Sequence, residues 1–272
     1  MTEAVQSAGQ PKVHPEIAYH QLLSLTIKLG VLLLTNGAEI YRVEESMQRI
    51  LNAYGIETTD VFAIPNLIII SMETPEQATV TKSKRVYTRA TNYDIVCEVN
   101  DYVRQVYAEK PPLADIDKQI KEIRNRPIYG FPMQLFAAAM VGFAFTLFFG
   151  GTLLDALVGM SAVLLAKALC IQMERFHANS FFVTVVASFI HTTVVTGCSL
   201  FIPGLQLGKI ITGTLMILVP GVAFTTAIRD VIARDLLAGM VAGIECLLVG
   251  CAIAIGSAVG YWAVSEGWQW LT

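Results

Sequence analysis

A proline–glycine step inside an apolar stretch is the feature of this sequence that most directly suggests chemistry. Pro220-Gly221 lies in the charge-free run 210–228. Proline lacks a backbone N–H and breaks a helix, and a broken helix persists in a membrane only where buried groups or water satisfy the freed amides and carbonyls. The half-helix that starts near Val222 would therefore offer free N–H groups and a positive dipole end to a carboxylate.

Residues downstream of this step could complete such a site. Thr225 and Thr226 add hydroxyl groups, and Arg229 adds a cation two turns further along the helix. We therefore expect a substrate site made of Pro220, Gly221, Thr225, Thr226, Arg229 and Asp230. A simple proline kink would leave the same pattern and is the structural alternative.

Other ionisable residues lie in apolar segments, where a charge costs at least about 2.5–3.5 kcal/mol and is normally kept for a pathway or a pair. The candidates for carrying protons are Asp155, His191 and Glu245. Each has a structural alternative: Asp155 could reach an interface, His191 could hydrogen-bond to another helix, and Glu245 could pair with an arginine. Lys167, near the other end of the helix that contains Asp155, is expected to extend to the interface.

Charges also cluster in the polar half, in the segment Glu39-Ile40-Tyr41-Arg42-Val43-Glu44-Glu45. On a helix Glu39, Arg42 and Glu45 share one face, as in a solvated ladder of ion pairs worth a few tenths of a kcal/mol each. The sequence contains no GxxxxGK[ST] phosphate loop, no HExxH and no GxSxG. We expect no catalytic residues, no metal, no cofactor and no ATP-driven step.

Composition and charge divide the chain into two parts, of which one suits water and the other suits the lipid bilayer. Of the 272 residues, 54% are hydrophobic and 15% charged, and the net charge is −3. Residues 1–126 include 30 charged residues, whereas residues 127–272 include 11. Such a chain is too apolar to be disordered, and it has no cluster of basic residues of the kind that binds nucleic acid. The sequence predicts a cytosolic domain over 1–126 and a transmembrane domain over 127–272.

The second half has five apolar segments, and a crossing takes about 20 residues. We expect transmembrane helices at about 132–150, 153–171, 179–200, 208–227 and 240–262. Arginines occupy alternate loops, namely Arg124 and Arg126 before the first helix, Arg175 after the second, and Arg229 and Arg234 after the fourth. The positive-inside rule then predicts a cytoplasmic N-terminus and an external C-terminus.

The first half is patterned as helices on a small sheet. Residues Ile40, Val43, Met47, Ile50, Leu51 and Tyr54 follow the spacing of one helical face, and Ile17–Leu34 is also helical in pattern. Between them either Asn36 caps a new helix or Gly37 kinks one long helix, and we favour a break. Strands at 58–64, 67–72, 78–82 and 85–90, with a turn at Pro65-Asn66, and helices at 92–109 and 113–125 complete an α+β domain.

Two separated segments also match a known family. The first contains Gly37, Glu39, Tyr41, Arg42 and Glu44, and the second runs from Val219-Pro220-Gly221-Val222 through Arg229-Asp230 to Asp235-Leu236-Leu237-Ala238-Gly239. In both, the chain resembles the threonine/serine exporter family. The resemblance covers nearly the whole chain and implies a cytosolic N-terminal domain followed by five spans.

The resemblance also implies a function. Members of the family export threonine and serine, and a two-component branch of similar length is linked to succinate export with a smaller membrane protein. Because single-chain members carry a second membrane block, we expect a smaller polytopic membrane protein as partner. The expected role is that of an exporter subunit in the cell inner membrane, which moves small carboxylates and is coupled to an ion gradient.

Two other functions stay open. One is a membrane-tethered hydrolase that uses residues around Glu39 and Arg42. Five spans with a broken helix exceed what an anchor needs, and no nucleophile–base set is visible. The other is a non-transporting regulatory or assembly subunit, if the translocation path lies mostly in the partner.

Overall fold

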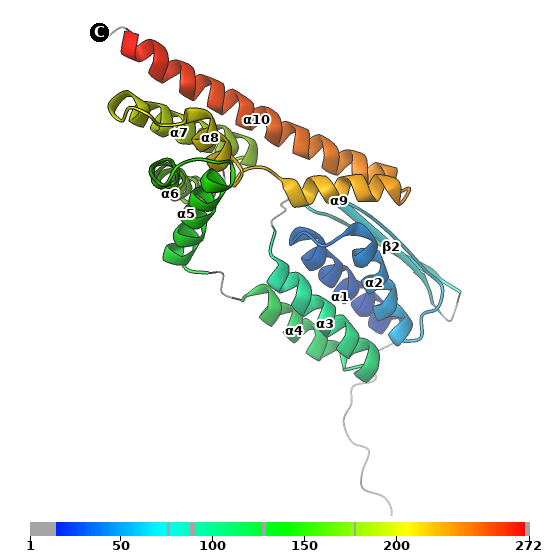
Figure 1. Cartoon of the computed structure of the whole chain (residues 1–272). Coiled ribbons are helices and arrows are strands. Elements are labelled where there is room, and N and C mark those ends of the chain that lie inside the picture. Colours follow the sequence, from blue (N-terminus) through cyan, green and yellow to red (C-terminus); the bar gives the residue numbers. More distant parts are fainter. Residues whose placement is uncertain (1–14, 75–76, 88–90, 127–128, 177, 270–272) are drawn as a thin grey trace, which may run out of the picture. The chain divides into compact units, whose positions relative to one another are not determined.

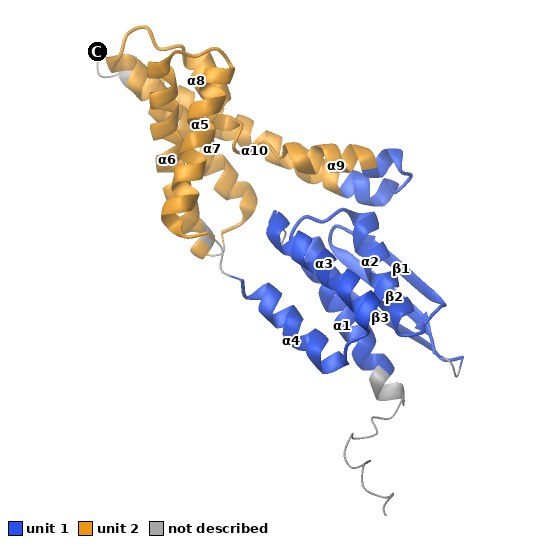
Figure 2. Ribbon diagram, turned by 60° about the horizontal axis from the view of Figure 1, so that its bottom comes forward, with its two compact units in different colours: residues 1–126, 230–241 blue, residues 127–229, 242–272 orange. Residues whose placement is uncertain are grey.

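The computed structural model describes residues 15–74, 77–87, 91–126, 129–176 and 178–269. Its elements are α1 (Pro15–Thr35), α2 (Ile40–Ala53), β1 (Thr59–Ile64), β2 (Leu67–Glu73), β3 (Thr79–Arg85), α3 (Tyr93–Glu109), α4 (Leu113–Arg124), α5 (Phe131–Phe148), α6 (Leu153–Arg175), α7 (Ser180–Phe201), α8 (Leu207–Leu215), α9 (Gly221–Ile232) and α10 (Leu236–Gln269) (Figure 1). They form two compact units (Figure 2). The first is residues 1–126 with 230–241, and the second is residues 127–229 with 242–272.

The first unit has three layers. The sheet is antiparallel in the order β1-β2-β3, α1 and α2 pack against it, and α3 and α4 pack against α1. The apolar face of α2 is buried as its spacing predicted, and β1 joins β2 through the predicted Pro65-Asn66 turn, with Ile64 paired to Leu67. A single strand, β3, replaces the two predicted at 78–82 and 85–90. Residues 88–90 lie outside the described part of the chain.

The junction between α1 and α2 is a break, as favoured from the sequence, but Asn36 does not cap α2. Gly37 has a φ of 90°, which favours glycine. The Asn36 side chain donates to the carbonyl of Leu32 at 2.7 Å and so satisfies the end of α1. Glu39 occupies the N-cap position of α2 without a side-chain capping bond.

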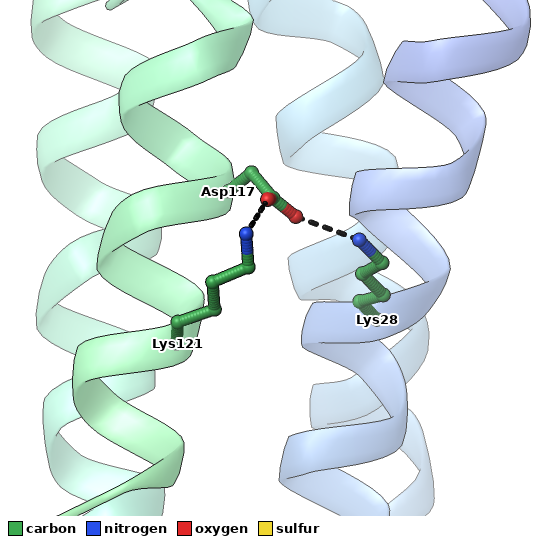
Figure 3. Close-up of polar contacts among 3 residues, drawn as sticks. All are labelled: Lys28, Asp117 and Lys121. Atoms are coloured by element: carbon green, nitrogen blue, oxygen red, sulfur yellow. Dashed lines mark hydrogen bonds and ion pairs between the residues drawn. The ribbon is translucent and has the colours of Figure 1, made fainter.

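A carboxylate joins α1 to α4 on the outside of this unit. The Oδ1 atom of Asp117 lies 2.6 Å from the Nζ of Lys28, and its Oδ2 lies 2.6 Å from the Nζ of Lys121 (Figure 3). Hydrogen bonds from Lys121 and Lys28 lower the pKa of Asp117 to about 2. The two lysines therefore stabilise the ionised carboxylate.

The end of α9 and the start of α10, Asp230–Val241, belong to the first unit. Ala238 is fully buried in the same hydrophobic cluster as residues of α1, α2, α3 and α4. The sequence analysis placed this segment in the membrane domain with the rest of residues 127–272. Its assignment to the first unit depends on a contact between residues far apart in the chain.

The second unit is helical, with α5, α6, α7 and α8 packed against one another. Four helices of the described chain are long and apolar enough to cross a membrane, namely α5, α6, α7 and α10. The chain is thus a polytopic helical membrane protein. The segment expected as one helix over 208–227 is divided into α8 and α9, and α9 begins at Gly221, directly after Pro220.

Small residues allow close approach of the helices in this unit. A Cβ atom at Gly213 of α8 would lie 2.6 Å from the backbone nitrogen of Thr146 in α5, and one at Gly159 of α6 would lie 2.7 Å from the Thr146 hydroxyl. In α10, a Cβ at Gly260 would lie 2.7 Å from the Phe189 carbonyl of α7. Thr146, fully buried, is therefore the point where α5, α6 and α8 meet.

Candidate functional site

The charged segment of α2 forms local ion pairs. The Nε of Arg42 lies 2.9 Å from Oε2 of Glu39 and donates to the hydroxyl of Tyr41 at 3.1 Å. The Tyr41 hydroxyl and the Glu39 charge raise the pKa of Arg42. Glu45 pairs with Arg49 at 2.6 Å. The predicted ladder is present, although Glu45 uses Arg49 rather than Arg42.

A hollow of about 320 Å³ lies beside this segment. It is lined by Tyr41, Arg42, Glu45, Ser46 and Arg49 of α2 and by Asn100, Val103 and Arg104 of α3. Each lining arginine is near a carboxylate, since Arg104 lies 3.8 Å from Asp101 and the other two have the partners given above. The hollow is therefore close to neutral and is not a built anion site.

Glu44 connects α2 to the sheet. Its Oε1 accepts a hydrogen bond from the backbone N–H of Ala63 at 2.8 Å. Burial raises the pKa of this carboxyl, and the charges of Asp235 and Asp60 raise it further, against the lowering effect of the Ala63 hydrogen bond. The first unit thus brings Glu44 near Asp235, so that residues of both family-like segments lie in one compact body.

The proline–glycine step produces a helix start. The Leu218 N–H donates to Leu215, the Gly221 N–H donates to Val219, and the Phe224 N–H donates to Pro220, each at 2.9 Å. The last of these is the first bond of the α9 helical ladder, so the N–H groups of Val222 and Ala223 lie at the helix start, where a helix cannot satisfy them itself.

The residues expected to bind substrate are spread along α9. Thr225 is exposed, and its hydroxyl donates to the Val222 carbonyl at 2.9 Å. Thr226 and Arg229 are half-buried and Asp230 is 5% exposed. Because a helix rises about 1.5 Å per residue, Arg229 lies about 12 Å beyond Gly221 along the axis.

The three proton-carrier candidates have different surroundings. Asp155 is fully buried and accepts hydrogen bonds from the backbone and hydroxyl of Thr152 at 2.7 and 2.8 Å and from the Gln206 N–H at 3.0 Å. Glu245 is exposed on α10. His191 is 1% exposed in α7, and its Nδ1 has no hydrogen-bond partner within the described chain.

A cavity of about 230 Å³ lies between α6 and α7. Its lining residues are Val163, Ala166, Lys167, Cys170, Ser180, Val183, Thr184, Ala187, His191, Ile217 and Leu218. Lys167 lines this cavity, and its extension to a membrane interface stays a prediction. The charge of Lys167 in an apolar helix marked the residue as unusual in the sequence. The cavity could not be predicted, because it depends on helix packing that sequence periodicity does not reveal.

No cluster of metal ligands accompanies these features. Across the residues that the structure describes, no three His, Cys, Asp or Glu side chains gather in a way that could hold a metal ion. The polar groups that line the cavity between α6 and α7 include hydroxyls, an imidazole and an ammonium group. Such groups can bind an organic anion through hydrogen bonds and charge.

Comparisons with known proteins identify the family of the chain. Residues 24–263 match the family described as "Putative threonine/serine exporter". The chain is 23% identical over 239 residues to the "Probable threonine/serine exporter" of Mycobacterium tuberculosis, covering 87% of this chain and 45% of that protein. It is 25% identical over 254 residues to the "Threonine/serine exporter" of Corynebacterium glutamicum, covering 91% and 52%. The chain thus spans about half the length of these relatives. No solved structure matches it.

Proposed function

The chain belongs to the threonine/serine exporter family, and from that premise we propose that it is a transporter subunit that exports small carboxylate metabolites. The family implies transport rather than enzymatic catalysis. The observation that carries the proposal is the α8–α9 break, because polar backbone in an apolar segment is the device with which transporters bind ions and acids.

We propose that the chain crosses the membrane five times. The helices α5, α6, α7 and α10 each cross once, and α8 and α9 together form a discontinuous crossing around Pro220. Residues 1–126, together with Asp230–Val241 of the same compact unit, would then form the cytosolic part, and the rest of residues 127–272 the membrane domain. The arginines of alternate loops favour a cytoplasmic N-terminus and an external C-terminus in the cell inner membrane.

The proposed substrate site combines the start of α9 with its later polar residues. Pro220 and Gly221 expose the N–H groups, Thr225 and Thr226 supply hydroxyls, and Arg229 supplies a cation, with Asp230 beside it. Arg229 lies about 12 Å beyond Gly221 along the helix axis. A small acid would therefore bind first at one end of α9 and then at the other, or bind both ends at once through its two polar ends.

Coupling to an ion gradient is proposed because the sequence has no phosphate loop. Asp155, His191 and Glu245 are the proposed proton carriers among the titratable groups in or beside the crossings. The hydrogen bonds that Asp155 accepts favour a structural role, so His191 and Glu245 are the stronger candidates for carrying protons.

The proposed substrate is a small carboxylic acid, and the proposed partner is a second membrane protein. The names of the two relatives suggest threonine or serine, and a dicarboxylate such as succinate offers the same carboxylate chemistry. We also propose that this chain works with a smaller polytopic membrane protein that supplies part of the path.

Proteoliposomes that contain the chain with and without this partner would test the proposal. Efflux of threonine, serine or succinate with both chains is the expected result. Arg229→Ala should abolish most of it, whereas Arg234→Ala, at a nearby exposed position, should not. Unchanged rate and affinity in an assembled Arg229→Ala complex would exclude the carboxylate role. Full transport by the partner alone would make this chain a regulatory or assembly subunit.

A further inference from the structure

The cavity between α6 and α7 is separate from the residues of α9 that the proposed function uses. Its wall is formed by α6, by the first half of α7, and by Ile217 and Leu218 of the α8–α9 linker. It extends from Ser180, the first residue of α7, to His191, which is about 16 Å further along that helix. All of these residues belong to the second unit.

Lys167 gives the cavity its charge. It is the only formally charged side chain in the lining, and within the described chain it forms no hydrogen bond or ion pair. A cation in a membrane-crossing helix is costly and is normally kept for a pathway or a partner. Among the described lining residues there is no carboxylate, so an anion that entered the cavity would give Lys167 a counter-charge.

His191 supplies a second polar group that lacks a partner. The residue is 1% exposed, and its Nδ1 makes no hydrogen bond to any described residue. An unsatisfied buried polar atom is destabilising, so a native structure normally satisfies it with a ligand or a bound water. The hydroxyls of Ser180 and Thr184 line the same space, and both can accept or donate a further hydrogen bond.

The volume limits what can fit. Sites for drug-sized ligands have about 300–1,000 Å³, and this cavity has about 230 Å³. It therefore suits a metabolite of a few heavy atoms with an anionic end for Lys167 and a polar group for His191. Small hydroxy, amino and dicarboxylic acids meet this description.

We propose that this cavity is a carboxylate-binding site in which Lys167 holds the carboxylate and His191 binds a polar group of the same ligand. The substrate would bind here before it reaches α9, and this order of binding rests on the proposed function. On the proposed orientation, the junction of α6 and α7 faces the cytoplasm, so the cavity fills from the side where an exporter collects its substrate. The linker residues Ile217 and Leu218 place the occupied cavity next to the helix break.

Binding measurements on the full chain with its partner, in lipid nanodiscs, test the site directly. The probes are succinate, L-threonine and the uncharged analogue succinamide. Lys167→Met should weaken binding of succinate and threonine about tenfold to a hundredfold, the range expected for loss of a charge-assisted hydrogen bond, and Lys167→Arg should restore part of it. Lys118→Met, on the surface of α4, is the matched control. Succinamide should bind poorly to every form.

Cys170 provides a second measurement that leaves Lys167 in place. Cys170 is 6% exposed and lines the cavity. In a chain whose other cysteines are replaced by alanine, succinate or threonine should slow its reaction with a small methanethiosulfonate at least severalfold, and succinamide should not. Undiminished labelling at saturating probe, or wild-type affinity in Lys167→Met, would overturn the site.

The two proposals fail in different ways. If Lys167→Met abolishes binding but the wild-type complex transports nothing, the cavity site stands and the exporter function is wrong. If Lys167→Met exports with unchanged substrate affinity, the exporter function stands and the cavity site is wrong.

Discussion

Asp155 accepts a hydrogen bond of 3.0 Å from the backbone N–H of Gln206, and this bond joins the start of α6 to the loop before α8. The same carboxylate accepts two hydrogen bonds from Thr152. A carboxylate with three donors is stabilised in its ionised form and orders both loops.

Asp155→Asn should therefore reduce stability more than it alters transport. One amide oxygen replaces two carboxylate oxygens, and the amide NH₂ faces donors that it cannot satisfy, so the expected loss is about 1–3 kcal/mol. The measurement is the melting temperature in detergent, together with the pH profile of export. An unchanged melting temperature combined with a flattened pH profile would instead identify Asp155 as a proton carrier.

Gly213→Ala should destabilise the membrane unit. The new Cβ would meet the Thr146 backbone at 2.6–2.7 Å, and α5 and α8 would have to separate at an estimated cost of about 1–3 kcal/mol. Gly208→Ala is the control in the same helix, since nothing lies within 4 Å of its Cβ. Thermal unfolding of both variants in detergent should show a lowered midpoint for Gly213→Ala alone.

Glu44→Gln should increase stability, and more so as the pH rises. The pKa of Glu44 is raised above its usual 4.5 in the folded chain, so its contribution to stability declines as the pH rises from about 4.5 through the folded value. Glutamine cannot ionise, and its amide oxygen can still accept the Ala63 hydrogen bond.

Melting temperatures between pH 4 and 8 test this expectation. Glu45→Gln is the control, because Glu45 forms an exposed pair with Arg49. If the difference in melting temperature between Glu44→Gln and the wild type did not increase with pH, the prediction that burial of an ionised Glu44 lowers stability would be wrong.

Asp117→Asn should destabilise the first unit at neutral pH but not in strong acid. The folded pKa of about 2 is below the usual 3.8, so the stabilisation by Lys28 and Lys121 is present above about pH 4 and is lost as the pH falls towards 2. Unfolding curves at pH 6 and pH 2 should differ between variant and wild type only at pH 6, and less at high salt. Asp101→Asn, which loses only an exposed 3.8 Å contact, should match the wild type at both.

The sequence predicted the features that depend on neighbours along the chain. The buried face of α2, the Pro65-Asn66 turn and the break at Pro220-Gly221 each follow from local spacing or from the backbone chemistry of proline and glycine. These features are enough to identify helices and to suggest where polar backbone is exposed.

Features that depend on distant contacts were not predicted. The bond from Gln206 to Asp155 spans 51 residues, and the cavity beside Lys167 exists only because α6, α7 and the α8–α9 linker meet. Hydropathy treats every charge in an apolar helix alike, so it could not separate Asp155, which has three donors, from Lys167, which lines a cavity.

The burial of Ala238 among residues of α1 to α4 has a consequence for biosynthesis. A ribosome delivers the chain from its N-terminus, so Ala238 emerges only after α5 to α9 have been made. At about 5–20 residues per second, Ala238 is made several seconds or more after the other helices of this core. The part of the core surface that Ala238 covers would therefore stay exposed during synthesis until the start of α10 emerges.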